Sequence, residues 1–127
     1  MSQPVNVRAM IITPRGEVIV LPYAITLINL QATVGGYIEA ITGPTWHAYV
    51  NENGVPMNLE LNPLATLVII RGDAHVSMVG GTLRGTVIFL GNASGHGEGD
   101  VPRSLVDIAH QLQREHDFPE PTGDQSE

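Results

Sequence analysis

Two adjacent glycines, Gly35 and Gly36, are the residues whose type and spacing come closest to a known chemical motif. Glycine-rich turns bind phosphate through backbone amides, and the dinucleotide fingerprint places such a turn after a strand and before a helix. Here the pair follows a helix-like run and precedes a strand-like run, and the chain contains no lysine for a phosphate-binding loop. We therefore favour a left-handed helix end at Gly35. A backbone site for an anion is the alternative, to which Tyr37 and Asn62 would contribute.

The five histidines do not follow the close spacing that is typical of a metal site. His110 and His116 are six residues apart, which places them on different faces of a helix. His96 stands beside Glu98 and Asp100, but the surrounding glycines would leave this loop too mobile to organise a metal ion. We expect neither a metal nor another cofactor.

Hydroxyl and carboxylate side chains do not indicate a catalytic centre either. Ser77, Ser94 and Ser104 lack the strained turn that exposes a nucleophilic serine, and Ser104 fits better as a helix cap. Glu39 and Glu60 are the only acids in apolar, strand-like surroundings, but side-chain alternation makes Glu39 outward-facing. We predict no catalytic residue and no enzymatic activity.

The aromatic residues Tyr37, Trp46 and Tyr49 flank a predicted hairpin and could share one face of a sheet. Tyrosine and tryptophan are enriched at binding hot spots, but they are equally ordinary in cores and on sheet surfaces. We favour packing. The candidate binding residues form a short set without a catalytic or metal-binding member: Gly35, Gly36, Tyr37, Glu39, Trp46, Tyr49 and Asn62.

Patterns of apolar residues predict the elements that must position these side chains. The predicted elements are strands at 5–12 and 17–21, a helix capped by Thr26 that runs to Val34, strands at 37–41 and 46–51, a segment at 64–71 that could be helix or strand, a strand at 85–90 and an amphipathic helix from about 101. Residues 92–100 are expected to form a glycine-rich loop. The order β-β-α-β-β-α-β-α, with hairpins, predicts a single α+β domain over residues 1–115 with a mainly antiparallel sheet. Residues 116–127 are polar and proline-rich, which predicts an acidic disordered tail.

Composition limits the classes of partner. The chain has 127 residues, no cysteine and a net charge of −7. Residues 1–97 carry five acids and four arginines, whereas residues 98–127 carry eight acids and two arginines. The acidic charge is therefore concentrated at the C-terminal end, and no basic face is available for nucleic acid. No apolar run reaches the roughly 18 residues of a membrane span. We expect no direct nucleic-acid binding and no membrane association.

Four stretches together resemble one known family. They are LQATVGGYIE at Leu30–Glu39, NENG at Asn51–Gly54, NPLAT at Asn62–Thr66 and GTVIFLG at Gly85–Gly91. This pattern resembles domain-of-unknown-function family 3846 (DUF3846), small proteins found largely in bacteriophage genomes and in some plasmids and bacteria. The resemblance covers about residues 5–91 and leaves the C-terminal helix and tail outside. It implies a phage source but no established activity, cofactor or catalytic residue.

We therefore expect a non-catalytic phage accessory protein that binds a host or phage protein in the host cytoplasm. The arginine-only basic residues would suit a G+C-rich host such as an actinobacterium. Self-association is left open. A small-molecule binder, for example a sponge for a nucleotide signal, is the alternative. A DNA mimic is disfavoured, because the body of the chain is nearly neutral.

Overall fold

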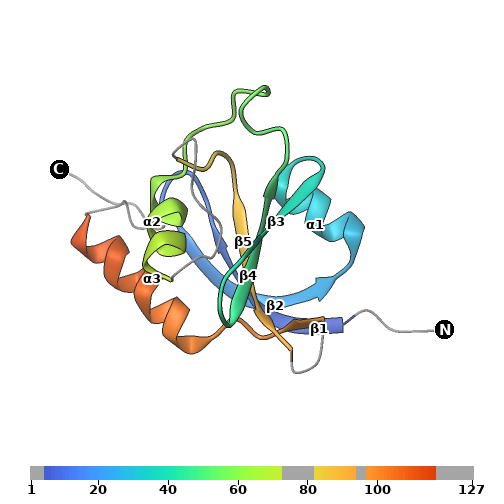
Figure 1. Ribbon diagram of the computed structural model, residues 1–127, viewed down its shortest axis with the longest axis vertical. Coiled ribbons are helices and arrows are strands. Elements are labelled where there is room, and N and C mark those ends of the chain that lie inside the picture. Colours follow the sequence, from blue (N-terminus) through green and yellow to red (C-terminus); the bar gives the residue numbers. More distant parts are fainter. Residues whose placement is uncertain (1–4, 73–81, 94–96, 117–127) are drawn as a thin grey trace.

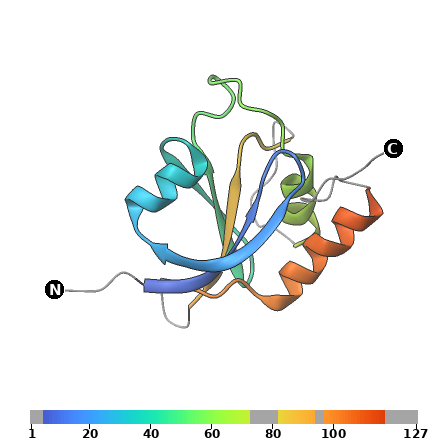
Figure 2. The ribbon, with the colours of Figure 1, turned by 180° about the vertical axis from the view of Figure 1, so that it is seen from behind.

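The computed structural model describes residues 5–72, 82–93 and 97–116. Over these ranges the chain forms one antiparallel sheet with helices on both faces (Figures 1 and 2). The elements are β1 (Val5–Ile12), β2 (Val18–Ile25), α1 (Leu27–Val34), β3 (Ile38–Thr42), β4 (Trp46–Asn51), α2 (Pro63–Arg71), β5 (Val87–Asn92), β6 (Glu98–Gly99) and α3 (Arg103–Glu115). The strand order is β2-β1-β5-β4-β3, and β6 pairs with one end of β5. The predicted α+β class is confirmed.

The strand β5 and the second half of β1 are covered on both faces, which explains why Val87–Leu90 and Ala9–Ile12 are continuous apolar runs. Alternate side chains point to opposite faces. Met10 and Phe89 belong to a core cluster with α2 and α3, whereas Ala9 and Ile88 belong to a second cluster with α1. Figure 1 shows α1 on one side of the sheet and α2 and α3 on the other.

The short helix α1 begins and ends where the sequence predicts. The hydroxyl of Thr26 accepts a hydrogen bond from the Asn29 N–H, and Gly35 ends the helix in the left-handed region with φ 84°. Leu30 and Val34 are buried against the sheet. Leu27 precedes Leu30 by three residues and Val34 by seven, a spacing that predicts the same helix face, but its side chain is 58% exposed. The helix is only two turns long, so its first turn lies beyond the sheet surface that it covers (Figure 2).

Helix α2 resolves the segment at 64–71 that the sequence leaves open. Asn62 caps the helix by accepting a hydrogen bond from the Ala65 N–H, and Pro63 occupies the first position. Both residues favour a helix start, and the β-branched side chains that follow are accommodated because Val68 and Ile69 are fully buried in the core. Packing therefore outweighs their strand preference.

Several boundaries differ from the predictions: β3 and β5 are shifted by one and two residues toward the C-terminus, and three further differences have a structural reason. β2 continues past residue 21 to Ile25 through Pro22, which is tolerated because β2 is an edge strand whose N–H groups need no partner on one side. Part of the predicted loop at 92–100 is instead the β5–β6 hairpin, in which Gly91 pairs with Gly99. The predicted cap at Ser104 is wrong, because α3 begins at Arg103 and its cap position, two residues before Ser104, is held by Pro102, which makes no side-chain cap.

The apolar patterns predict no helix or strand over residues 72–82, and most of this stretch and of the predicted tail at 116–127 lies outside the described residues. Within the described ranges, no helix has the length and apolar character needed to cross a bilayer.

Candidate functional site

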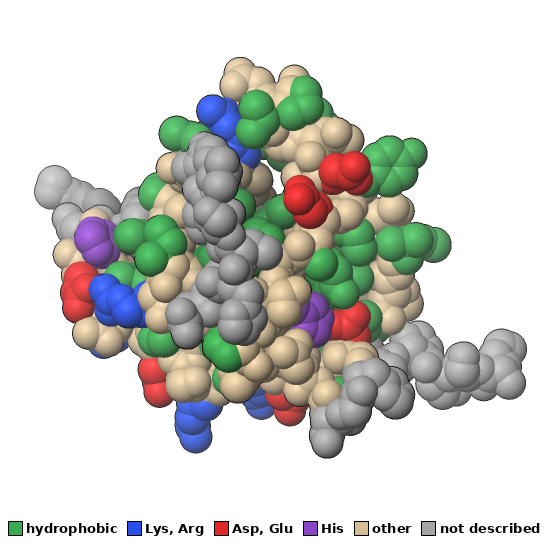
Figure 3. All heavy atoms as spheres, viewed as in Figure 1, with side chains coloured by type: hydrophobic (Ala, Val, Ile, Leu, Met, Phe, Trp, Pro, Cys, Tyr) green, Lys and Arg blue, Asp and Glu red, His purple; other side chains and the backbone are tan. Residues whose placement is uncertain are grey.

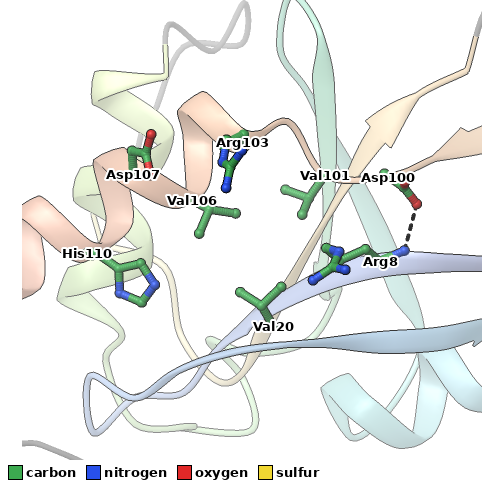
Figure 4. Close-up of a pocket in the computed structure, with 8 residues that line it drawn as sticks. All are labelled: Arg8, Val20, Asp100, Val101, Arg103, Val106, Asp107 and His110. Carbon is green, nitrogen blue, oxygen red and sulfur yellow. Dashed lines mark hydrogen bonds between the residues drawn. The ribbon is translucent and has the colours of Figure 1, made fainter.

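A pocket of about 540 Å³ lies between α3 and the β1–β2 hairpin (Figure 4). Its volume falls in the range of small-molecule sites in proteins. The lining combines an apolar floor of three valines with charged groups at the rim. The lining residues are Arg8, Val20, Asp100, Val101, Arg103, Val106, Asp107 and His110.

Helix α3 contributes half of this pocket because it carries two neighbouring stripes. One stripe packs into the core with α2 and contains Leu105, Ala109 and Leu112. The second stripe has the spacing i, i+3, i+4 and i+7, which places its members on one helix face. Its members line the pocket: Arg103, Val106, Asp107 and His110.

The backbone of Arg8 is anchored to the segment that leads into α3. The Arg8 N–H donates to Asp100 Oδ1 at 2.8 Å, although the two residues are 92 positions apart in sequence. The Arg8 carbonyl accepts from the Val101 N–H at 2.9 Å. Pro102 then continues in an extended conformation to Arg103, the first residue of α3. Arg8 and Arg103 are therefore positioned relative to each other by main-chain contacts.

Gly91 allows this segment to approach β5. A Cβ atom at position 91 would lie 1.9 Å from the Asp100 carbonyl oxygen, far inside van der Waals contact. Only glycine fits at such a close approach of two backbones. Gly91 thus indirectly helps to place Asp100, and through it Arg8, at the pocket.

The pocket lining carries two arginines and two aspartates, so its formal charges cancel, but none of these four side chains forms a described ion pair. Within the described ranges, the only side-chain ion pair joins His47 and Glu98 at another site. In Figure 4 the guanidinium groups of Arg8 and Arg103 point toward the three valines, whereas the Asp107 carboxylate points away from them. The Asp100 carboxylate accepts a hydrogen bond from the Arg8 N–H and keeps its negative charge. The charged groups that point toward the valines are therefore the two guanidinium groups.

A second polar cluster lies on the sheet face that α1 partly covers. His47 Nε2 contacts Glu98 Oε1, His47 Nδ1 lies 2.6 Å from Asn92 Oδ1, and the Tyr49 hydroxyl donates to Glu98 Oε2 at 3.0 Å. Burial, followed by the charge of Glu98 and its hydrogen bond, raises the pKa of Tyr49 to about 12. A phenol with that pKa is a poor nucleophile near neutral pH. The cluster joins β6 to β4 and β5, so we infer that it stabilises the β5–β6 hairpin.

No described group of three or more His, Cys, Asp or Glu side chains is arranged to hold a metal ion. Glu98 and Asp100 bond to different partners, His47 and the Arg8 backbone respectively. His96, the third member of the metal hypothesis, lies outside the described residues.

The Gly35-Gly36 pair ends α1, as the sequence favours. The N–H groups of both glycines donate to the Gln31 carbonyl, at 2.8 and 3.0 Å. The amides that an anion site would require are therefore already engaged. Gly36 has a packing reason as well, because a Cβ atom there would lie 2.9 Å from Nδ2 of the buried Asn51.

Asn62 is fully buried, and all its side-chain contacts are internal. Its Oδ1 caps α2, and its Nδ2 donates to the carbonyls of Ile12 and Gly85 at 2.9 and 2.8 Å. Tyr37, its expected companion in an anion site, is 67% exposed. Asn62 therefore links α2, β1 and the segment before β5.

Trp46 and Tyr49 do not share a face of the sheet, which the sequence had left possible, because residues three apart in a strand point to opposite faces. Trp46 is buried in the α2–α3 cluster, where its Nε1–H donates to the Gly72 carbonyl at 3.0 Å. Tyr49 packs against the α1 cluster. Glu39 is exposed on the edge strand β3 opposite Val50.

The pocket was missed by sequence reasoning. The spacing of Arg103, Val106, Asp107 and His110 could have revealed a second face on α3. Nothing in the sequence indicates that Arg8 lies opposite that face, because only the sheet and the β5–β6 hairpin bring residues 8 and 100 together.

The stretches that resemble DUF3846 mainly hold the fold together. Asn51 Nδ2 donates to the Val34 carbonyl. The Thr66 hydroxyl donates to the Asn62 carbonyl and accepts from the Leu83 N–H. Gly85 adopts φ 82°, the left-handed region that favours glycine. The pocket residues lie outside these stretches, so the resemblance makes no prediction about them.

Comparison with known proteins bears out the resemblance. A family model described as "Domain of unknown function (DUF3846)" matches residues 7–115. This match extends beyond the expected limit at residue 91 and includes α3, which had been placed outside the family pattern. No curated protein and no solved structure matches the chain. Because the family model covers most of its length, the chain belongs to the DUF3846 family.

Proposed function

We propose that this protein is a non-catalytic binding module, and that its ligand site is the pocket between α3 and the β1–β2 hairpin. The observation that supports this proposal is the combination of a 540 Å³ cavity, a valine floor and two arginines that form no ion pair with a described carboxylate. Concave, partly apolar sites with a few converging polar groups are typical of small-molecule binding.

The absence of catalysis is part of the proposal. His47 and Glu98 are the described pair that most resembles catalytic machinery, and their described contacts include no serine or threonine hydroxyl. The one hydroxyl that contacts Glu98 belongs to Tyr49, whose pKa is raised to about 12. We further propose, from the resemblance, that the protein is encoded by a bacteriophage and acts in the cytoplasm of its host.

Native mass spectrometry of the protein recovered from the cells that produce it tests the pocket directly. We expect a retained small mass in stoichiometric amount. Replacing Val106, which lines the pocket, with tryptophan should fill the cavity and abolish retention. The matched control is Ile28→Trp, which adds the same indole to a side chain that is 77% exposed on α1.

Loss of the retained mass in Val106→Trp alone would support the pocket. Equal retention in both variants would contradict it. The pocket would also be contradicted if no mass is retained and if small molecules from a library bind equally to Val106→Trp and to the unmodified protein.

A second candidate function is suggested by exposed apolar side chains at one end of the molecule. The connection between β4 and α2 exposes Val55, Met57 and Leu61 to between 50% and 72%, and Tyr37 lies beside it through a hydrogen bond from the Glu52 N–H to the Tyr37 carbonyl. Figure 3 shows hydrophobic side chains gathered over this end. Such patches are typical of protein-binding surfaces.

We propose a host or phage protein as the partner for this surface, which we name the β4–α2 surface. Val55→Asp and Met57→Asp should release a protein partner but leave the pocket ligand in place. Val106→Trp should have the opposite effect. If neither aspartate variant changes the set of co-purified proteins, the β4–α2 surface is not the protein-binding site.

A further inference from the structure

We infer that the ligand of the α3 pocket is a small organic phosphate with an apolar body. This inference rests on the proposed function, because it names the chemical class of ligand for the same pocket. It is carried by the positions of Arg8 and Arg103 and by the valines between them.

The basic side chains that line the pocket point to an anionic ligand. The protein has six basic residues other than histidine and a net charge of −7, yet two of the six arginines line one pocket. His110 completes the basic set at the other end of the valine floor, as Figure 4 shows. The described part of the chain provides no ion pair to any of these three side chains. Asp100 and Asp107 also line the pocket, but the Asp100 carboxylate accepts the Arg8 N–H and the Asp107 carboxylate points away from the valines. An anionic group is therefore the partner that the two inward-pointing guanidinium groups lack.

Geometry selects phosphate over carboxylate. One guanidinium satisfies both oxygens of a carboxylate in a bidentate pair. A phosphate monoester offers three oxygens and close to two negative charges, which two guanidinium groups can share. Arg8 and Arg103 come from two different elements, β1 and α3, and both guanidinium groups point toward the valines, so a group with three oxygens offers a separate acceptor to each of them.

The backbones of the two arginines are held in place before any ligand binds, whereas their side chains are exposed. Hydrogen bonds on both sides of Arg8 tie its backbone to Asp100 and Val101, and Arg103 follows two residues later. The Asp100 carboxylate contributes to this anchor rather than to the recognition of a cation. Binding therefore requires ordering of two side chains but not of the backbone, which lowers its entropic cost.

Apolar surface defines the rest of the ligand. Val20, Val101 and Val106 belong to three different segments and all line the same cavity. An inorganic phosphate ion would leave this surface exposed, whereas a phosphate ester with an apolar body would cover it. We therefore expect the organic portion to contribute to affinity.

Arginine side-chain NMR signals provide the test, because only six Nε–H resonances are expected. The probes are phenyl phosphate, inorganic phosphate, benzoate and benzylamine. Phenyl phosphate should shift the two resonances that disappear in Arg8→Gln and Arg103→Gln and leave the other four in place. Each substitution should weaken phenyl phosphate binding by about tenfold or more.

Arg114→Gln is the matched control. Arg114 is exposed in the last turn of α3 and does not line the pocket, so this substitution removes the same charge from the same helix. Binding should stay within about twofold of the unmodified protein. Arg114 is eleven residues from Arg103, about 16 Å along the helix, which exceeds the screening length of about 10 Å in salt. Neither pocket substitution should unfold the protein, because the anchor of Arg8 uses only its backbone atoms.

The outcomes separate the ligand class from the proposed function. Tighter binding of phenyl phosphate than of inorganic phosphate and benzoate would support the inference. Equal or tighter binding of benzoate or benzylamine, or equal affinity for the two phosphates, would overturn it and leave a pocket that binds another class of molecule. If phenyl phosphate fails to shift the Arg8 and Arg103 resonances while Val106→Trp still releases a retained mass, only the ligand class is wrong.

Discussion

Asn62 offers a sharp test of how this fold is held together, because its side chain makes three hydrogen bonds in a fully buried position. Asn62→Asp keeps the oxygen that caps α2, and aspartate is as good a cap as asparagine. It removes both donors to the carbonyls of Ile12 and Gly85 and places a carboxylate against them. The substitution thus separates capping from the two long-range bonds.

The expected loss of unfolding free energy follows from these contacts. Two internal hydrogen bonds contribute about 2 kcal/mol together, and the buried unsatisfied groups add about 1–3 kcal/mol. We therefore expect Asn62→Asp to cost about 3–5 kcal/mol at neutral pH, a large part of the roughly 5–15 kcal/mol of a typical domain. Thr26→Ala removes only a cap on α1 and should cost about 1 kcal/mol.

Urea unfolding measures both losses. Trp46 is the only tryptophan and is 2% exposed, so its emission should shift to the red when the chain unfolds. The midpoint should fall while the slope with urea stays constant. Burial raises the pKa of a carboxyl group. The penalty of Asn62→Asp should therefore be largest at neutral pH and shrink on acidification, as the buried carboxylate becomes protonated.

The result that would refute this reasoning is an Asn62→Asp variant within about 1 kcal/mol of the unmodified protein at pH 7. Such a result would mean that the side chain does not bridge α2 to β1 and the segment before β5. It would return Asn62 to the set of candidate ligand contacts, where a polar replacement costs little stability.

Two further predictions concern the β5–β6 hairpin. Gly91→Ala should lower the free energy of unfolding in urea by about 3 kcal/mol, because its Cβ would overlap the Asp100 carbonyl. Gly99→Ala should cost clearly less, because the nearest atom to its Cβ would be 3.4 Å away. Equal losses would contradict the close approach at Gly91. Tyr49 should ionise only near pH 12 in an ultraviolet titration. The unfolded chain loses that proton near pH 10, so stability should fall as pH rises from 10 toward 12, and Tyr49→Phe should remove this part of the loss; an unchanged alkaline transition in Tyr49→Phe would contradict the raised pKa.

Local signals predicted the boundaries of α1, where a capping residue and an end residue agree. Thr26 and Gly35 act within one or two turns of backbone, so their effect can be read from neighbouring residues. At α2 the cap at Asn62 competes with the strand preference of the β-branched residues that follow, so the sequence left the type of this segment open. The edge strand β2 was cut short at Pro22, because the cost of a proline depends on whether a neighbouring strand needs its N–H. Whether a neighbouring strand is present on that side depends on the tertiary structure.

The predicted site residues show the same division. Gly35, Asn62 and Trp46 are special residues in the sequence, and each has a local or packing role: a helix end, a buried cap and a core side chain. An unusual residue type signals a demanding environment, which a fold can supply without any ligand. Arg8 and His110 are ordinary residue types, and only their positions make them notable.

The sequence by itself determined the α+β class, the order of most elements, the ends of α1 and the apolar character of β5 and of the second half of β1, since each depends on contacts along a few residues or on apolar periodicity. Tertiary structure alone decided that β6 pairs with β5, that Trp46 and Tyr49 serve opposite layers and that Arg8 meets Arg103 across a valine floor. These features depend on backbone contacts between residues far apart in sequence, and no local pattern encodes which distant segment will lie alongside.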